Sequence, residues 1–256
     1  MRIIEYPDVK QIIVCGDIHG NFSGIVFKLC IQYACTNTLL IVAGDCGFGF
    51  HKPGHYEQIY NSVAGRLRKA NNYVVFVRGN HDDPAYFAEE KVSYKRWRTV
   101  PDYSVIQACG HNILCIGGGI SIDRLMRQEE NARMRERGHL QTAVWWPDEA
   151  PVFNPDAIDF LPVEIQVDTV VTHSAPSFCE LNSKYGLRSW AAEDPRLLED
   201  VEAERRTLDE IQKCLLHNEH PVKRWFYGHF HQSWNAMIEG IRYYMLDIEE
   251  FREIPE

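Results

Sequence analysis

Five short segments of the chain combine a small residue or a tight turn with side chains that can bind metal ions. They are 16–20 (GDIHG), 44–47 (GDCG), 79–82 (GNHD), 172–176 (THSAP) and 228–231 (GHFH). Carboxylate, amide and imidazole groups are ligands of borderline first-row cations, whereas structural zinc sites favour thiolates. Asp17 and His19 lie two residues apart, so on an extended segment both side chains face the same way and can chelate one ion. His229 and His231 repeat this spacing, and together the segments predict a metal-dependent active site.

Each of these segments follows a short apolar run of the kind that forms a buried strand. The runs are 12–15, 39–43, 73–77, 169–171 and 225–227, and a sixth, 113–116, precedes three glycines at 117–119. Continuous apolarity over four or five residues is typical of strands buried on both faces. Because ligands bind at the carboxyl ends of such strands, we expect the five segments to converge in one crevice.

Helical patterns separate the predicted strands. Residues 22–33 follow Asn21, a suitable N-cap, and residues 56–69 have apolar residues near helical spacing. The first hundred residues therefore predict a β-α-β-α-β order. Residues 194–217 form the strongest predicted helix. Its apolar residues form a stripe, and its charged residues fit a face exposed to solvent.

The remaining segments complete one predicted domain that covers residues 1–256. Residues 236–248 alternate and predict a hairpin that turns at Glu239-Gly240. Residues of about 123–155 mix arginine, glutamate, tryptophan and proline, and predict a helical and loop excursion that covers one end of the sheets. Its charges fit a solvated helix face better than a substrate-binding cap. Its two tryptophans at 145–146 either stack a base or, more commonly, anchor the loop.

Composition excludes several classes of protein. The chain has 256 residues, a hydrophobic fraction of 45% and a net charge of −9, which excludes a disordered chain and disfavours a sequence-blind binder of duplex nucleic acid. The eight cysteines form no C-x-x-C pair, and no run of 18 apolar residues occurs. The first eleven residues lack a basic region followed by an apolar stretch. We therefore expect a reduced, cytoplasmic protein with no membrane partner.

In the five segments the sequence resembles the calcineurin-like metallophosphoesterase superfamily. The matching blocks run from near residue 12 to residue 231. The resemblance implies an α/β fold, a four-layer α/β/β/α sandwich of two mixed sheets flanked by helices, with a dinuclear metal site at the strand carboxyl ends. It also implies a hydrolase that cleaves a phosphomonoester or phosphodiester by attack of a metal-bridging hydroxide. A non-catalytic scaffold on the same fold is the alternative, but such scaffolds lose ligands that this chain retains.

The same resemblance implies a role for individual side chains. One metal ion would be held by Asp17, His19 and His231, the other by Asn80, His173 and His229, with Asp45 bridging both and His81 as the catalytic residue. A shared carboxylate suits two cations about 3.5–4 Å apart. An imidazole near its pKa can protonate the leaving alkoxide or stabilise the phosphoryl oxygens. Two divalent or trivalent ions are implied, manganese first, with iron, zinc, cobalt and nickel as alternatives.

The second block departs from the serine/threonine phosphatase branch of that superfamily, which reads G-D-x-x-D-R-G. Phe48 stands in place of the aspartate that orients the catalytic histidine, and Gly49 in place of a phosphate-binding arginine. A protein-phosphatase function is therefore doubtful. His81 either takes another partner, for which Asp82 is a candidate, or works unassisted.

The substrate stays open at this point. A small phosphorylated molecule is expected, with nucleotides, dinucleoside polyphosphates, phosphoproteins and nucleic-acid ends as alternatives. Arg124 follows the glycine triplet and is a candidate to clamp phosphate, since glycines allow close approach of a ligand to the backbone. Alternatively, the triplet is a tight turn between sheets and Arg124 pairs with Asp123 or a nearby glutamate.

Overall fold

Two mixed sheets form the centre of the computed structural model, which describes residues 2–52, 54–138, 142–179 and 187–255. The six-stranded sheet has the order β13 (Phe251–Glu253), β2 (Gln11–Cys15), β3 (Thr38–Ala43), β4 (Tyr73–Val77), β6 (Trp97–Thr99), β5 (Ser93–Tyr94). The seven-stranded sheet has the order β1 (Ile3–Glu5), β7 (Ser104–Ala108), β8 (His111–Ile116), β9 (Thr169–Thr172), β10 (Arg224–Tyr227), β12 (Ile241–Met245), β11 (Trp234–Ile238). Strands β2, β3, β4 and β6 run parallel, and so do β8, β9, β10 and β12.

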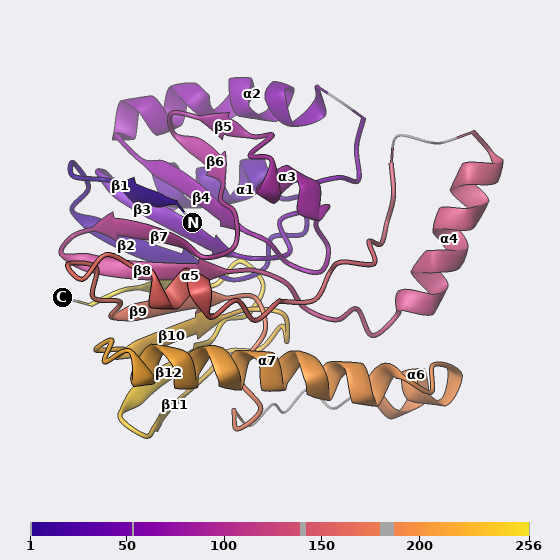
Figure 1. Ribbon diagram of the computed structural model, residues 1–256. Helices are drawn as coiled ribbons and strands as arrows, with labels where there is room; N and C mark the ends of the chain where they lie inside the picture. The colour runs from indigo at the N-terminus through magenta and orange to yellow at the C-terminus, as the bar shows by residue number, and fades with distance from the viewer. Residues whose placement is uncertain (1, 53, 139–141, 180–186, 256) are drawn as a thin grey trace.

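Helices cover the outer face of each sheet (Figure 1). Over the six-stranded sheet lie α1 (Phe22–Phe27), a π-helical turn (Lys28–Gln32), α2 (His55–Ala70) and α3 (Pro84–Ala88). Over the seven-stranded sheet lie α5 (Asp156–Asp159) and α7 (Leu197–His217), the latter preceded by α6 (Leu187–Glu193). The predicted four-layer α/β/β/α sandwich is confirmed.

Side chains of the central strands alternate between the two faces of their sheet. In β3, Leu39 and Ile41 point between the sheets, where they join a cluster that includes Phe226 of β10. Leu40 and Val42 point the other way and join the cluster under α1 and α2. Because both faces are buried, the strand is apolar throughout and shows a continuous run in place of an alternation.

The helix predicted at 194–217 corresponds to α7, which begins only at Leu197, after Pro195. A separate helix, α6, was not predicted and occupies residues 187–193. Proline removes a backbone donor and disfavours helical geometry in the residue before it, so Pro195 separates α6 from α7 and Asp194 lies in neither helix. From Leu208 onward α7 packs its apolar stripe against the seven-stranded sheet.

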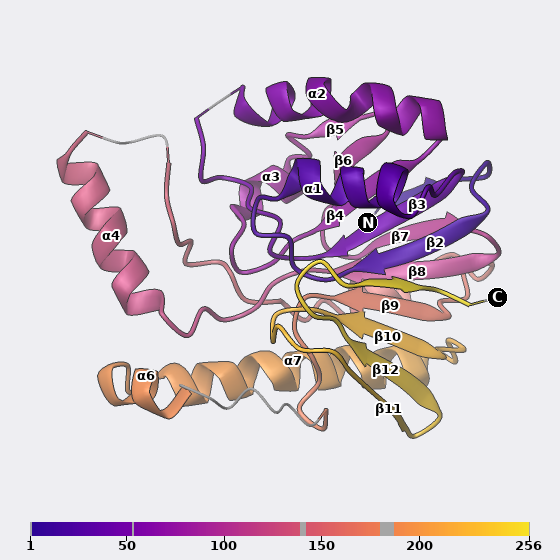
Figure 2. The same ribbon diagram turned by 180° about the vertical axis from the view of Figure 1, so that it is seen from behind.

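The predicted helical excursion contains α4 (Arg124–Glu136), which projects from the side of the molecule, apart from both sheets (Figures 1 and 2). Asn131 is its buried residue, and its amide makes two hydrogen bonds of 2.7 Å to the backbone of 144–145. The ring of Trp146 lies edge-on to Phe50 with 5.4 Å between centroids, so it anchors the returning loop. None of the helices in the described ranges combines the length and the apolar composition that crossing a membrane requires.

Candidate metal centre

The side chains predicted to bind metal lie at the carboxyl ends of five strands drawn from both sheets. Asp17 and His19 follow β2, Asp45 follows β3, Asn80 and His81 follow β4, His173 follows β9, and His229 and His231 follow β10. The first three strands belong to the six-stranded sheet and the last two to the seven-stranded sheet. The site is therefore complete only when both sheets are in place.

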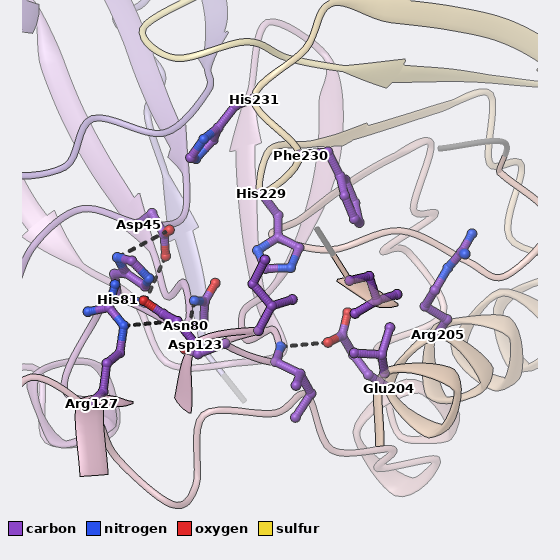
Figure 3. A pocket seen from close by; sticks show the side chains of 15 residues that line it. Asp45, Asn80, His81, Asp123, Arg127, Glu204, Arg205, His229, Phe230 and His231 are labelled. Carbon is purple, nitrogen blue, oxygen red and sulfur yellow. Dashed lines mark hydrogen bonds and ion pairs between the residues drawn. The ribbon is translucent and has the colours of Figure 1, made fainter. Parts of the chain in front are cut away.

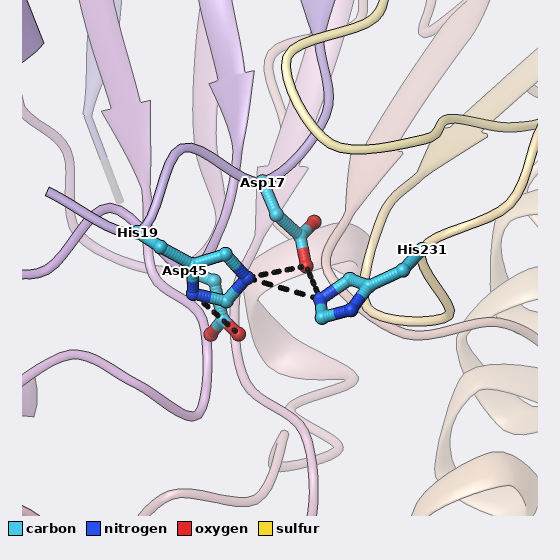
Figure 4. A group of neighbouring side chains, drawn as sticks. All are labelled: Asp17, His19, Asp45 and His231. Carbon is cyan, nitrogen blue, oxygen red and sulfur yellow. Dashed lines mark hydrogen bonds and ion pairs between the residues drawn. The ribbon is translucent and has the colours of Figure 1, made fainter. Parts of the chain in front are cut away.

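Four of these side chains gather closely enough to hold one ion (Figure 4). One potential ligand atom from each of Asp17, His19, Asp45 and His231 lies within 4.8 Å of the others. Nε2 of His231 lies 2.9 Å from Oδ2 of Asp17 and 3.0 Å from Nε2 of His19. Lone pairs of carboxylates and imidazoles thus converge on one point, the arrangement that a first-row cation needs.

A second group lies beside the first and shares Asp45 with it. Nε2 of His173 is 2.9 Å from Oδ1 of Asn80 and 3.1 Å from Oδ1 of Asp45. Nδ1 of His173 donates to the carbonyl of Ala43 at 2.8 Å, which directs Nε2 into the site. The ring of His229 lies 4.9 Å from that of His173, centroid to centroid. All seven predicted ligands are thus brought together.

Protonation in the metal-free site is controlled by burial and by the pairing of His173 with Asp45. Burial alone would lower the pKa of His173, but the Asp45 carboxylate raises it to about 10. Burial likewise opposes a charge on Asp45, yet cationic His173 holds the pKa of Asp45 well below its usual range. Burial and repulsion by His173 lower the pKa of His229 to about 3. A cation bound at His173 must displace its proton, so metal affinity at this point falls as the pH falls.

Four of the predicted ligands have a left-handed backbone conformation. The φ angles are 42° at His19, 45° at Asp45, 68° at His229 and 50° at His231. For residues other than glycine this region costs free energy, and it persists only where the surrounding structure imposes it, commonly at functional sites. The strand ends are therefore bent so that these side chains turn back into the site.

Two glycines make room for the carboxylates. A Cβ at Gly79 would lie 2.0 Å from the backbone nitrogen of Asp45, and a Cβ at Gly228 would lie 2.0 Å from Oδ1 of Asp17. Neither clash could be relieved without moving a predicted ligand. The glycines that precede Asn80 and His229 are therefore required by the close approach of neighbouring strand ends.

A buried chain of hydrogen bonds orients the amide of Asn80. Nδ2 of Asn80 donates to Oγ of Ser121 at 2.9 Å, and that hydroxyl donates to Oε2 of Glu149 at 2.5 Å. The N–H of Ser121 donates to the other oxygen of Glu149 at 3.1 Å. Because Glu149 accepts the hydrogen bond of the Ser121 hydroxyl, that hydroxyl can only accept a hydrogen bond from Asn80. Nδ2 of Asn80 therefore points to Ser121, and Oδ1 faces His173.

His81 lies against the first group of ligands. The backbone N–H of His81 donates to Oδ1 of Asp45 at 2.8 Å, and ring atom Nδ1 lies 3.9 Å from Oδ2 of Asp45. The ring centroids of His81 and His19 are 5.5 Å apart. Burial lowers the pKa of His81, which favours the neutral imidazole. A neutral ring can still donate one N–H to an oxygen at the site.

Asp82 is used elsewhere and does not orient His81. Its two carboxylate oxygens accept the backbone N–H groups of Cys46, Gly47, Phe48 and Gly79 at 2.8–3.0 Å. Burial and the charge of Asp45 raise the pKa of Asp82 to about 7, while these N–H groups oppose the rise. Asp82 therefore ties the loop after β3 to the loop after β4.

Arg124 lies at the start of α4, where its side chain pairs with two carboxylates. Its guanidinium forms ion pairs with Asp194 at 2.5 Å and Asp200 at 2.7 Å, which bridge α4 to α6 and α7. Within the described ranges neither Asp123 nor a glutamate pairs with Arg124, so the partners differ from those that the sequence suggested. The hydrogen bonds to Asp194 raise the pKa of Arg124 above its usual range.

The two positions that depart from the phosphatase pattern serve packing. Phe48 is fully buried among aromatic rings, with Phe22 at 5.0 Å and Phe76 at 5.2 Å between centroids. Gly49 has a φ of 102° and a Cβ there would lie 2.4 Å from Cβ of Asp83. A carboxylate at position 48 would lie buried among aromatic rings, and position 49 has no room for a side chain.

A cavity of about 340 Å³ opens onto the metal-binding residues (Figure 3). Its lining includes Asp45, Asn80, His81, His229 and His231 from the site, Ile120, Ser121, Ile122, Asp123 and Arg127 around the start of α4, and Leu187, Val201, Glu204, Arg205 and Phe230. Glu204, Arg205 and Phe230 lie on one side of His229, and Asp45 and His81 lie on the other (Figure 3).

The donor set fits two metal ions. Oδ2 of Asp17 is buried with no hydrogen-bond donor from the described part of the chain aligned on it, although Nε2 of His231 lies 2.9 Å away. Around His173, one oxygen of Asp45 and one oxygen of Asn80 face Nε2. In the neutral ring Nε2 carries no proton, because the ring proton is on Nδ1, which donates to the carbonyl of Ala43. Only a cation, a bound metal or a proton, reconciles these facing acceptors.

Sequence reasoning missed the residues that surround the ligands. Ser121 lies in the segment that follows the glycine triplet, but only its contact with Asn80 reveals its role. Glu149 and Glu204 carry no motif, and burial raises the pKa of each to about 7. Arg127 belongs by sequence to a solvated helix face, yet it lines the cavity.

Comparison with known proteins supports one family. The family model of calcineurin-like phosphoesterases matches residues 10–233. The serine/threonine-protein phosphatase 6 catalytic subunit of Caenorhabditis elegans is 26% identical over 158 residues, 54% of this chain and 46% of that protein, so the match spans about half of the relative's length. The structure of TT1561 of Thermus thermophilus aligns over 94% of this chain and 90% of its own, with 12% identity and a TM-score of 0.48. Phosphopantetheinyl hydrolase from Mycobacterium tuberculosis aligns over 95% and 96%, with 15% identity and a TM-score of 0.41.

Proposed function

The chain belongs to the calcineurin-like phosphoesterase family, and from this premise we propose that it hydrolyses a phosphomonoester or phosphodiester at a dinuclear metal centre. The observation that carries the proposal is the convergence of seven ligand-type side chains from five strand ends of both sheets. A purely structural role gives no reason to gather two carboxylates, an amide and four imidazoles at one place, since buried charged groups cost free energy unless they are paired or bind metal.

In the proposed centre each group described above holds one ion. Asp17, His19 and His231 would hold the first, Asn80, His173 and His229 would hold the second, and Asp45 would serve both. When bound, such a pair lowers the pKa of a water molecule and neutralises phosphate oxygens during in-line attack. We propose manganese as the first metal to test, because oxygen and imidazole ligands accept it readily.

The chain's own residues hold and orient the reacting groups. Ala43 keeps the proton of His173 on Nδ1, and Ser121 keeps the oxygen of Asn80 turned into the site. His81 faces the cavity beside Asp45. In the proposed reaction the neutral ring of His81 donates a hydrogen bond from its N–H to the oxygen that departs from phosphorus, and solvent supplies the proton.

The cavity supports a small substrate. Its volume of about 340 Å³ lies at the lower end of the range for small-molecule sites, about 300–1,000 Å³. Phe48 and Gly49 occupy the positions at which the protein phosphatases carry an acid and an arginine, and both are committed to packing. A small phosphorylated molecule is therefore proposed in preference to a phosphoprotein.

The proposal is tested by the hydrolysis of an aryl phosphate and an aryl phosphodiester by the purified chain with manganese. Asp45→Asn and His81→Ala should each lower kcat by at least about a hundredfold, since each removes a group at the reacting atoms. His217→Ala removes an exposed imidazole at the end of α7 and should leave the rate unchanged. If the wild type is inactive with every metal and both esters, the function fails and a scaffold becomes the better interpretation.

A further inference from the structure

We propose that the substrate is a small phosphate ester whose organic group is apolar and lies in the cavity between the start of α4, the start of α7 and Phe230. The inference rests on the proposed function and names the substrate class of the same site. Three properties of the cavity support it: its wall is largely apolar, the charged side chains in the wall already have partners within the protein, and its volume is small.

Beyond the metal-binding residues the wall is largely apolar. Ile120 and Ile122 come from the segment before α4, Leu187 and Val201 from α6 and α7, and Phe230 from the loop after β10. Ile122 is 37% exposed and lines the cavity together with the other four, so the apolar surface is contiguous there. These five side chains surround the space into which the group attached to phosphate would extend.

The charged side chains of the wall are already engaged by the protein. Nε of Arg127 donates to Asp123 at 2.7 Å, and Arg205 donates to three backbone carbonyls at 2.7–2.9 Å. Nε of Arg205 lacks an acceptor among the described residues, but it is shielded from solvent. Glu204 accepts the N–H of Ile120 at 2.6 Å, and burial raises its pKa to about 7. The wall thus offers few free polar groups to sugar hydroxyls or to a second phosphate.

The size of the cavity limits the organic group. A space of about 340 Å³ holds on the order of ten water-sized groups, and a phosphate takes about five of them. An organic group of about five or six heavy atoms fills the remainder. Longer groups would have to extend into solvent, where additional methylenes contribute nothing.

The test is a series of primary alkyl phosphates, from ethyl to octyl, assayed with the manganese-loaded wild type. The leaving alcohols have nearly the same pKa, so differences report binding of the chain and not the chemistry of departure. Each buried methylene should raise kcat/KM about fourfold, so butyl should exceed ethyl by roughly 16-fold. The gain should stop near hexyl. Propyl phosphate should exceed glycerol 1-phosphate, which has the same three carbons but carries two hydroxyls.

Variants locate the effect in this wall. Val201→Asp should abolish the dependence on chain length, and Ile122→Asp, from the segment before α4, should do the same if the first variant folds poorly. Leu198→Asp is the matched control, since Leu198 lies on the same helix, is 50% exposed and is absent from the lining. Its dependence on chain length should equal that of the wild type.

The outcomes separate this inference from the proposed function. Equal kcat/KM for ethyl, butyl and hexyl phosphates, or faster cleavage of glycerol 1-phosphate than of propyl phosphate, overturns the apolar substrate while leaving the phosphoesterase in place. A chain-length dependence that survives in both Val201→Asp and Ile122→Asp overturns the location. Absence of hydrolysis for every ester overturns the proposed function itself, and the substrate class with it.

Discussion

Replacement of Ser121 by alanine tests whether the site is organised by residues behind the ligands. Ser121→Ala removes two buried hydrogen bonds, the one from Nδ2 of Asn80 at 2.9 Å and the one to Oε2 of Glu149 at 2.5 Å. Each leaves a buried polar partner without its bond, at a cost of about 1–3 kcal/mol. The free energy of unfolding of the metal-free protein should therefore fall by about 2–6 kcal/mol.

Equilibrium unfolding in urea with a chelator present measures this loss. Ser104→Ala is the control, because Ser104 is equally buried but makes a single hydroxyl bond, to the carbonyl of Pro101 at 2.7 Å. That variant should lose only about 1 kcal/mol. A loss in Ser121→Ala no larger than in Ser104→Ala would refute the reasoning.

A second measurement separates organisation of the site from stability. Without Ser121 the amide of Asn80 is free to rotate, so its oxygen no longer faces His173 permanently. Loss of such an outer partner typically weakens metal binding about 10- to 100-fold. Calorimetric titration with manganese should show this weakening for Ser121→Ala and none for Ser104→Ala. Equal manganese affinity in the two variants would show that Asn80 needs no support.

Two further outcomes follow from buried carboxylates. Burial raises the pKa of Glu204 from 4.5 to about 7, so the folded state binds the proton more tightly than the unfolded state and stability is lost as the pH rises between these values. The free energy of unfolding of the wild type should fall by about 3 kcal/mol. Glu204→Gln does not titrate, so its free energy of unfolding relative to the wild type should rise by that amount between about pH 5 and pH 8, as measured by urea unfolding. A difference that stays constant with pH would contradict the assignment. Asp82→Asn turns an amide toward two of the four N–H groups that the carboxylate now accepts, and should lower the free energy of unfolding by about 2 kcal/mol or more. Unchanged stability of the metal-free Asp82→Asn protein would show that the two loops are held by other contacts.

The convergence of the candidate ligands could be predicted from the sequence because the features that single out each of them are local. Asp45 has the right functional group, follows a buried strand and is flanked by glycine, and all three features fall within a few residues. The carboxyl ends of neighbouring strands then meet by topology alone. The same locality explains why the hairpin at Glu239-Gly240 was predicted correctly, whereas the four layers were implied by the family resemblance.

The surroundings of the site could not be predicted because they depend on contacts between distant segments. Glu149 reaches Ser121 from 28 residues further along the chain, and Arg124 pairs with Asp194 from a distance of 70 residues. Nothing in the spacing of arginine and glutamate near α4 distinguishes Arg127, which lines the cavity, from Arg124, which does not. Short strands such as β1 and β13 have three residues each, too few for a pattern.

The exchange of edge strands between the sheets has a consequence for how the molecule could be taken apart. β1 comes first in the chain but pairs with β7 in the seven-stranded sheet, and β13 comes last but returns to β2 in the six-stranded sheet. A cut between β6 and β7 would leave each fragment holding a strand that belongs to the other. Neither fragment would then carry an intact sheet or an intact set of ligands. Separately expressed fragments would therefore have to recover each other before either could close its sheet, which makes recovery of metal binding a direct report of their reassembly.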